Sequence, residues 1–314
     1  MSARVLAVIV CYNPERAALE QTLMALQEQA VESVVVDNAS QNATDIQAQI
    51  SSFKNVKFKG LAQNLGLGYA HNQGIEIANQ GDFTHVLLLD QDSVPAAHMV
   101  ERLLQAYSQQ SRSDKVSAVG ARYLNPVDNS QSFFVRFGAL KFRRHYCDDS
   151  ASSNKADNVE TVECVHADFL ISSGSLISLK ALQEIGLMDQ DLFIDHVDTE
   201  WFLRAKSKGY KAFGVCSSTM QHGLGEQNHQ FSLGGRQRNV PQHKPFRYYY
   251  MFRNSIALYK RGYASALWKW NDLQRLSLIF VMYGFVKPPR LANLSMMAKG
   301  VWHGIIGRLG KLDD

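Results

Sequence analysis

Two carboxylates stand one residue apart in the stretch VLLLDQDSVP, directly after a run of residues typical of a buried strand. Asp90 and Asp92 can both face one ligand if the chain turns there, and carboxylate oxygens suit Mg²⁺ or Mn²⁺ shared with a diphosphate. The alternative is an Asx-type turn that caps a helix after Pro95, and a DxD pair met alone is more often such a turn. The pair therefore needs support from other residues before it predicts a metal site.

A second acidic stretch, FIDHVDTEWFLRA, predicts a helix with a carboxylate in its first turn. Asp198 has apolar neighbours there, and burial would raise its pKa toward the range that suits a general base. In a purely structural helix, Glu200 and Arg204 would form a solvated i,i+4 pair and Asp198 would interact with the helix dipole. Asp195 lies just before the helix. Both interpretations stay open from the residues alone.

Three further features bear on ligand binding. His222 follows a strand-like stretch and could complete a metal site from another element, although a single histidine is more often structural. Asp37 ends the run in VVVDNAS, where an acid can accept a hydrogen bond from a base imide or a ribose hydroxyl, or can cap the next helix. The segment NLGLGYAHNQGI, residues 64–75, has small residues that allow close approach of a ligand or another element. Its spacing is not GxGxxG, which argues against a dehydrogenase.

The elements that must position these residues alternate short β-branched runs with helix-period segments. Strands are predicted at residues 5–10, 34–36, 56–58 and 86–89, and helices from about residue 14 and over residues 68–78. This rhythm is typical of a parallel sheet with helices on both faces. Polar clusters follow three of the strands, at Tyr12-Asn13, Asp37-Asn38 and Asp90-Gln91-Asp92. Because ligands collect at the carboxyl ends of such strands, these clusters predict one binding edge.

The second half of the chain is less regular. Residues 125–162 predict a long excursion or a pair of edge strands, residues 169–179 a strand, and the stretch after residue 195 a helix that stops at Gly209 before another strand. The polar, Gly-rich loop that follows suits a lid over a bound ligand, or a plain connector. We therefore predict a catalytic domain at residues 1–224, a flexible lid loop at 225–245 and a helical extension at 246–314.

The composition fits one large globular domain with an appendage, since the 314 residues are 46% hydrophobic and 20% charged. The formal charge of +4 is mild, and we expect no nucleic-acid partner. The four cysteines have neither close pairs nor zinc-ligand spacing, which predicts packing residues in a reducing compartment rather than disulfides. The amino-terminal apolar run is too short to span a membrane and has no cleavage site, so we expect a cytoplasmic protein.

The carboxyl-terminal extension is basic and aromatic. Its stretch LSLIFVMYGFV is too short to cross a bilayer. Residues that suit an anionic membrane surface accompany it: Trp268, Lys269, Trp270, Arg290, Lys299, Trp302, Arg308 and Lys311. Peripheral membrane contact is one prediction, and packing on the catalytic domain or on a second subunit of a homodimer is the other.

Taken in order, the stretches VIVCYNP, VVVDNAS, NLGLGYAHNQGI, LLLDQDS, SGSLIS, DLFIDHVDTEWFLRAKSKGY and MQHG resemble the family 2 glycosyltransferases. The resemblance covers roughly residues 4–224 and implies the GT-A fold, a Rossmann-like mixed sheet flanked by helices. Within the family, FIDHVDTEW together with DQDS looks most like bacterial rhamnosyltransferases that use dTDP-L-rhamnose to build surface polysaccharide such as O-antigen.

The resemblance also implies roles for individual residues. The nucleotide-sugar contacts would be Tyr12, Asn13, Asp37, Asn64, Gly66, Asn72, Asp90 and Gln91. Asp92 would bind a Mg²⁺ or Mn²⁺ ion directly, with Asp90 and His222 as further metal ligands. Asp198 matches the second acid of the family's "ED" pair, the general base, whereas the first acid is Val197 here, which leaves support to Asp195 or Glu200. Arg253 belongs to an element after the lid that would line the acceptor or diphosphate side.

The implied reaction is an inverting sugar transfer in which the base takes a proton from an acceptor hydroxyl and no covalent enzyme intermediate forms. A UDP-hexose or UDP-GlcNAc donor is the alternative to dTDP-L-rhamnose, and the acceptor would be a glycan, lipid-linked if the extension lies on a membrane. A nucleotidyltransferase is disfavoured because the first strand is followed by CYNPERAA rather than a Gly-rich basic loop. A catalytically inactive glycan-binding protein would be expected to lose the DxD pair or Asp198, and this chain has both.

Overall fold

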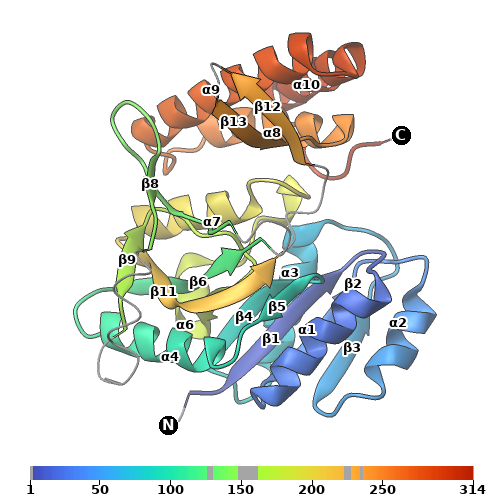
Figure 1. Ribbon diagram of the computed structural model, residues 1–314, viewed down its shortest axis with the longest axis vertical. Helices are drawn as coiled ribbons and strands as arrows, with labels where there is room; N and C mark the ends of the chain where they lie inside the picture. Colours follow the sequence, from blue (N-terminus) through green and yellow to red (C-terminus); the bar gives the residue numbers. More distant parts are fainter. Residues whose placement is uncertain (1–2, 126–129, 148–161, 223–227, 234–235, 314) are drawn as a thin grey trace.

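The computed structural model describes residues 3–125, 130–147, 162–222, 228–233 and 236–313, with the strands of residues 228–241 described by their backbone alone. Figure 1 shows two layers: a twisted sheet flanked by helices, and a group of helices from the carboxyl-terminal part lying across one end of it. The site residues predicted above lie in the sheet layer or at its border with these helices.

A mixed sheet forms the centre of residues 1–224, as expected. Its strand order is β3-β2-β1-β4-β10-β6-β11-β5, with β9 paired to β11. The strands of this sheet are β1 (Val5–Cys11), β2 (Glu32–Asp37), β3 (Val56–Gly60), β4 (His85–Asp90), β5 (Ser93–Pro95), β6 (Val116–Leu124), β9 (Cys164–Ala167), β10 (Ser175–Ser178) and β11 (Lys211–His222). Strands β1 to β4 pair in parallel, whereas β10 runs antiparallel to both of its neighbours. The sheet is mixed because of these antiparallel pairs and because β11 also runs antiparallel to β5 and β9.

The strands form where continuous apolar runs can be buried on both faces. Alternate residues of β1 divide between two core clusters, with Val8 in one and Ile9 in the other. Helices cover both faces: α1 (Arg16–Glu28), α2 (Ala43–Ile50) and α4 (Met99–Gln110) on one, and α3 (Leu67–Asn79), α6 (Leu179–Ile185) and α7 (Val197–Ser207) on the other. A 3₁₀ turn, η1 (Gln190–Leu192), lies between α6 and α7. The predicted alternation of strands and helices is confirmed for the first half of the chain.

The predicted strand over residues 169–179 is much shorter in the structure. Only β10 is extended, because the chain turns just before it: the Ser175 amide donates to the Ser172 carbonyl oxygen at 3.0 Å, and Gly174 has a φ of 81°. A residue with a Cβ is strained at such a φ. The turn places Ser172 and Ser173 at the carboxyl-end edge of the sheet, where the candidate site lies.

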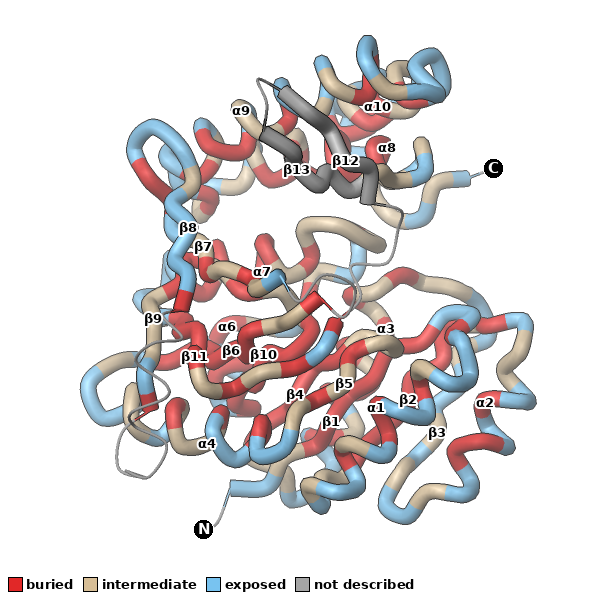
Figure 2. The backbone as a smooth tube through the Cα atoms, viewed as in Figure 1, coloured by how far each residue is buried: buried red, intermediate tan, exposed pale blue. Residues whose placement is uncertain are grey.

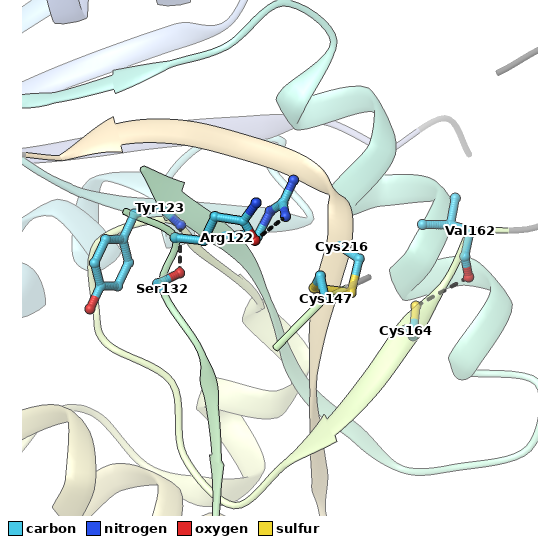
Figure 3. Close-up of a disulfide and its surroundings, with 8 residues drawn as sticks. Arg122, Tyr123, Ser132, Cys147, Val162, Cys164 and Cys216 are labelled. Carbon is cyan, nitrogen blue, oxygen red and sulfur yellow. Dashed lines mark hydrogen bonds between the residues drawn. A yellow bond between two sulfur atoms is a disulfide. The ribbon is translucent and has the colours of Figure 1, made fainter. Parts of the chain in front are cut away.

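The excursion after β6 contains a short antiparallel pair, β7 (Phe134–Arg136) and β8 (Arg143–His145). The prediction that all four cysteines are packing residues is wrong, because Cys147 and Cys216 form a disulfide (Figure 3). Their Cα atoms lie 5.5 Å apart although 69 positions separate them in sequence. The return of the excursion to β11 creates the pair, so sequence spacing carried no sign of it. The reducing compartment inferred from the cysteines loses that support, while Cys11 and Cys164 are free.

Two paired strands occupy most of the predicted lid segment, β12 (Asn228–Leu233) and β13 (Arg236–Pro241). Residues 223–227 and 234–235 lie outside the described part of the chain. Where an irregular loop was expected, the backbone therefore forms a hairpin, and its role as a lid stays a prediction.

The carboxyl-terminal extension is helical, as expected, and consists of α8 (Pro245–Tyr259), α9 (Ala266–Val281), the π-helical turn η2 (Met282–Val286) and α10 (Arg290–Ile306). Figure 2 shows buried residues where these helices face each other and the sheet layer, and exposed or intermediate residues on their outer side. Among the described residues, no helix has the length and apolar character needed to cross a bilayer.

Candidate active site

Three side chains gather at the carboxyl-end edge of the sheet: Asp90 at the end of β4, Asp92 in the turn after it, and His222 at the end of β11. One ligand atom from each lies within 4.8 Å of the others. His222 Nε2 is 3.8 Å from Asp90 Oδ2, and His222 Nδ1 is 3.5 Å from Asp92 Oδ1. In an octahedral site with ion–ligand distances of about 2.1 Å, two adjacent ligand atoms lie about 3 Å apart. Small movements of these three side chains would therefore let them bind one divalent cation.

Sequence order alone does not bring His222 to the acids; strand pairing does. Strand β11 runs antiparallel to β5, with His222 opposite Ser93. Ser93 Oγ lies 2.8 Å from His222 Nδ1 and 2.7 Å from Ser173 Oγ, and Ser173 Oγ accepts a hydrogen bond from the Asp90 amide. Partners of this kind orient a histidine ligand and select its tautomer. With Nδ1 bonded to Ser93, Nε2 is the ring nitrogen available to an ion.

The charge of the cluster favours a cation. The pKa of Asp90 is raised, mainly by burial. The positive charges of His222 and Arg247 oppose this rise, and the negative charge of the neighbouring Asp92 adds to it. Two carboxylates this close repel each other until a positive charge neutralises them. Carboxylates suit Mg²⁺ and Mn²⁺, and the imidazole nitrogen makes Mn²⁺ the better match of the two.

Asp198 lies in the first turn of α7 and is half-buried. Burial raises its pKa to about 6, and the negative charges of Asp195 and Asp90 add to this, while hydrogen bonds from the Thr199 and Ser172 amides oppose it. The Thr199 amide donates to Asp198 Oδ1 at 2.6 Å. A carboxylate with a pKa near 6 is largely ionised at neutral pH and still a usable proton acceptor. The backbone of Ser172 lowers the pKa of Asp198, and the Ser173 hydroxyl accepts a hydrogen bond from the Asp90 amide, so one turn lies beside both the candidate base and the metal cluster.

Asp195 forms a bidentate ion pair with Arg247 of α8, with hydrogen bonds of 2.9 and 2.7 Å. Its backbone is in the left-handed region, with a φ of 61°, as is that of the next residue, His196. The Asn254 amide group donates to the main-chain oxygen atoms of Leu192, Ile194 and Asp195, which holds this loop in place. The extension therefore fixes the loop that leads into the helix of the candidate base.

Glu200 is 1% exposed and does not form the solvated pair considered above. Its carboxylate accepts two hydrogen bonds from Arg204, both at 2.9 Å, and one from the Tyr263 hydroxyl at 2.5 Å, with Arg261 3.5 Å away. Tyr263 and Arg261 belong to the loop between α8 and α9. Glu200 therefore anchors α7 to the extension, on a face of the helix separate from Asp198.

The nucleoside end of the predicted site lies at β1 and β2, where Cys11 is paired with Asp37. Asp37 is fully buried; its Oδ2 accepts from the Ser40 amide at 3.1 Å, and its Oδ1 has no hydrogen-bond partner among the described residues. A buried carboxylate oxygen without a partner is costly and indicates a ligand. The Asn13 amide donates to Ser40 Oγ at 2.7 Å, and Tyr12 is half exposed beside it, its amide donating to Gln91 Oε1 at 2.8 Å.

Residues 64–74 serve packing more than ligand contact. Asn64 Oδ1 accepts from Asn38 and from the Gly66 amide, and Asn72 makes two hydrogen bonds with the main chain of Met188. A Cβ on Gly66 would lie 2.5 Å from the Phe193 carbonyl oxygen. The small residues therefore allow close approach of another element, which was one of the two expectations.

Arg253 of α8 is the next predicted site residue. It is fully buried, and its guanidinium donates to the main-chain oxygens of Leu192 and Gly310 and to Asn254 Oδ1. These bonds tie Gly310 to η1, and the expectation that Arg253 lines the acceptor or diphosphate side stays a prediction. Arg247, from the same stretch, is the arginine whose charge reaches the site. Sequence reasoning assigned no role to Ser93 and Ser173, and only tertiary pairing identifies them.

Comparisons with known proteins agree with this geometry. The model of the family described as Glycosyl transferase family 2 matches residues 6–175, more than half of the chain. The dTDP-rhamnosyl transferase RfbF of Shigella flexneri is 29% identical over 269 residues, which cover 85% of this chain and 83% of that protein. The poly-beta-1,6-N-acetyl-D-glucosamine synthase of Staphylococcus aureus is 22% identical over 240 residues, and the chain spans 54% of its length.

Solved structures with the same fold include the S. aureus TarS fragment 1–349 in complex with UDP-GlcNAc, with a TM-score of 0.58, 13% identity and coverage of 96% of this chain and 81% of that one. GalNAc-T7 with UDP, GalNAc and Mn²⁺ gives a TM-score of 0.57 at 14% identity, covering 97% of this chain and 56% of that one. These likenesses concern the fold. With the family match, they place the chain in glycosyl transferase family 2, as a glycosyltransferase of the GT-A fold.

Proposed function

We propose that this enzyme transfers L-rhamnose from dTDP-L-rhamnose to a glycan acceptor, with inversion and with the help of Mg²⁺ or Mn²⁺, in the synthesis of a bacterial surface polysaccharide such as O-antigen. The observation that carries the chemistry is the Ser172–Ser173 turn, which lies beside both Asp198 and the Asp90, Asp92 and His222 cluster. The choice of sugar is supported by the similarity to the Shigella rhamnosyltransferase, which extends over most of both chains.

In the proposed reaction, Asp198 accepts the proton of an acceptor hydroxyl as that oxygen attacks the anomeric carbon from the face opposite the leaving diphosphate. Its raised pKa makes it a stronger base than an exposed aspartate. Asp92 and His222 would hold the divalent ion, with Asp90 as a further ligand or bonded to the ribose or to the ion's waters. When bound, the ion supplies neutralising charge to the diphosphate.

Asp195 and Glu200 are proposed to position the base rather than to touch substrate. Asp195 holds Arg247 next to the acids, and Glu200 holds α7 against the extension. At the other end, Asp37 Oδ1, which has no partner in the described part of the chain, is proposed to accept from the base imide or the ribose, with Tyr12, Asn13 and Gln91 beside it. Asn64, Gly66 and Asn72 would shape the wall of the nucleoside site through packing.

A UDP-hexose or UDP-GlcNAc donor is the second candidate, favoured by the staphylococcal synthase and by the TarS complex with UDP-GlcNAc. Cytoplasmic location and a lipid-linked acceptor belong to the proposal as well. A catalytically inactive glycan-binding protein is the alternative of another class. The intact acidic cluster and the raised pKa of Asp198 favour an active enzyme.

A donor panel tests the proposal. The full chain with Mg²⁺ or Mn²⁺ is incubated with dTDP-L-rhamnose, UDP-glucose, UDP-galactose and UDP-GlcNAc, and the released nucleoside diphosphate is measured with and without a glycan acceptor. We expect turnover with dTDP-L-rhamnose that chelation of the ion abolishes. Turnover confined to UDP sugars would overturn the choice of sugar, and turnover unaffected by chelation would overturn the metal requirement.

A further inference from the structure

The outward side of the extension carries an unusual concentration of exposed apolar side chains. Eighteen large hydrophobic residues are exposed in the described part of the chain, and twelve of them lie within residues 267–306. The twelve are Leu267, Trp270, Leu273, Leu278, Phe280, Val281, Phe285, Val286, Leu291, Trp302, Ile305 and Ile306. We call this set the apolar face. Exposed apolar residues scattered singly are ordinary, whereas a contiguous set marks an interaction surface.

The spacing along α9 places these residues on one side of the helix. At 100° per residue, the buried Trp268, Asp272 and Leu276 share one side, and the exposed Trp270 and Leu278 point the opposite way. An amphipathic helix packed on a domain normally turns polar residues outward. Helix α9 is therefore apolar on the side that its own fold leaves uncovered.

Helix α10 repeats the arrangement. Leu291, Trp302 and Ile306 are exposed at positions i, i+11 and i+15, which lie within about 60° of one another on the helix. The opposite side of α10 packs on α8 so closely that a Cβ on Gly300 would lie 2.4 Å from the Tyr249 carbonyl oxygen. The close packing fixes which side of α10 faces outward, and that side is apolar.

The charges around the apolar face are mostly positive. From residue 266 to residue 314 the chain has seven basic residues and three acidic ones, Asp272, Asp313 and Asp314. Asp272 is buried and pairs with Arg275 at 2.8 Å, so it contributes no negative charge to the surface. Of the basic residues, Arg290, Lys299, Arg308 and Lys311 are exposed, and Arg308 pairs with Asp313. The outward side is thus apolar with a positive border.

We propose that the apolar face lies on an anionic membrane surface, with its tryptophan and leucine side chains in the headgroup region and its basic residues against acidic lipid. Exposed tryptophans, apolar side chains and a positive border are the features of helices that lie in the interface plane. No described helix is suited to crossing the bilayer, so the contact is peripheral. A symmetric contact between two copies would instead bring two positive borders together, which electrostatic repulsion opposes.

A hydrogen-bonded network links the apolar face to the candidate active site. Asp272 and Arg275 of α9 lie next to His196, with Arg275 Nη2 2.9 Å from His196 Nε2, and Ser255 of α8 is 3.0 Å from the same nitrogen. His196 directly precedes α7, whose first turn holds Asp198. A membrane-bound α9 would therefore hold the base at a fixed height above the lipid, which suits an acceptor anchored there.

Vesicle sedimentation of the full chain tests the inference without any donor or acceptor. The probes are phosphatidylcholine vesicles with and without about one third phosphatidylglycerol. We expect the chain to sediment with the anionic vesicles only, and to be released when salt is raised from about 0.1 to about 1 M. Leu278→Ser/Trp302→Ser should bind at least about tenfold more weakly, because two apolar side chains no longer enter the interface.

The matched control is Met24→Ser/Leu187→Ser, which removes two exposed apolar side chains outside the extension and should bind like the wild type. Arg290→Glu/Lys299→Glu should lose the preference for anionic vesicles. Thermal unfolding and donor turnover of every variant are measured alongside, so failure here is distinct from failure of the proposed function. Absence of vesicle binding by the wild type, or equal binding by Leu278→Ser/Trp302→Ser, would overturn the inference. A dimer that this variant dissociates, without vesicle binding, would assign the face to a second copy.

Discussion

The two ends of the proposed site are built in different ways. The proposed nucleoside end, around Asp37, is formed by parallel strands close together in sequence, β1 and β2, and by the loops that follow them. The reaction end, around Asp198 and His222, needs the antiparallel strand β10, the edge pairing of β5 with β11, and helices of the extension. The comparison teaches that local strand order can place a nucleoside site, whereas the base and metal ligands depend on long-range contacts.

Among changes at the reaction end, Asp198→Asn should have the largest effect on activity. The substitution keeps the shape and removes the proton acceptor, so we expect acceptor-dependent kcat to fall about 10²- to 10⁴-fold. Donor binding should be nearly unchanged, because the nucleoside end is separate. Steady-state transfer and donor titration measure the two quantities. Full acceptor-dependent transfer by the variant would reassign the base.

Loss of the anchor at Glu200 should act on stability. Glu200→Gln leaves Arg204 and Arg261 without their carboxylate, and we expect a loss of about 2–3 kcal/mol in the free energy of unfolding, since both arginines keep partial access to water. Denaturant unfolding measures it. The control Glu76→Gln, at an exposed site paired with Gln80, should change stability by less than about 0.5 kcal/mol. Equal stability of the two variants would refute the anchoring role.

A milder change at the same end is Ser93→Ala. The variant removes the partner of His222 Nδ1 but none of the proposed ligands, and we expect the affinity for Mn²⁺ to fall about 10- to 100-fold. Titration of the donor-free protein with Mn²⁺, followed by the EPR signal of the free ion, gives the affinity. An unchanged affinity would show that the serine does not orient the ligand.

Asp37→Asn tests the nucleoside end in isolation. It takes the negative charge from an oxygen that has no hydrogen-bond partner among the described residues, so the donor KM should rise about tenfold while kcat and the melting temperature stay the same. A drop in melting temperature with an unchanged KM would make Asp37 structural. Together with Asp198→Asn, this variant should separate binding from chemistry.

The smallest expected effect is the pH dependence of the wild type. The base acts as the carboxylate, and the pKa of Asp198 is raised to about 6, so kcat/KM should fall as pH drops through that value. A bound divalent cation lowers the pKa of a nearby acid, which moves the midpoint to 6 or below. A pH–rate profile from about pH 4 to about pH 9 measures the midpoint. A midpoint above about 7 would point to another group.

Much of the candidate site could be predicted from the sequence because its residues directly follow strands. The runs before Asp37 and Asp90 are continuous and apolar, and the polar residues after them had to meet at one edge of a parallel sheet. The raised pKa of Asp198 also follows from a sequence feature, an acid among apolar neighbours at the start of a helix. The sequence was less informative where the chain pairs at a distance, as in the Cys147–Cys216 disulfide and the partners of His222.

By itself, the sequence determined the order of strands and helices in the first half, the acids at the binding edge and the apolar, basic character of the extension. Tertiary structure alone decided that Ser93 and Ser173 support His222 and Asp90 in the metal cluster, that Glu200 and Arg253 are buried anchors, and that the apolar residues of α9 face outward. The physical reason is the sequence separation of the residues that interact. Periodicity and strand ends are local properties of the chain, whereas side-chain partners and burial depend on which distant segments pack together.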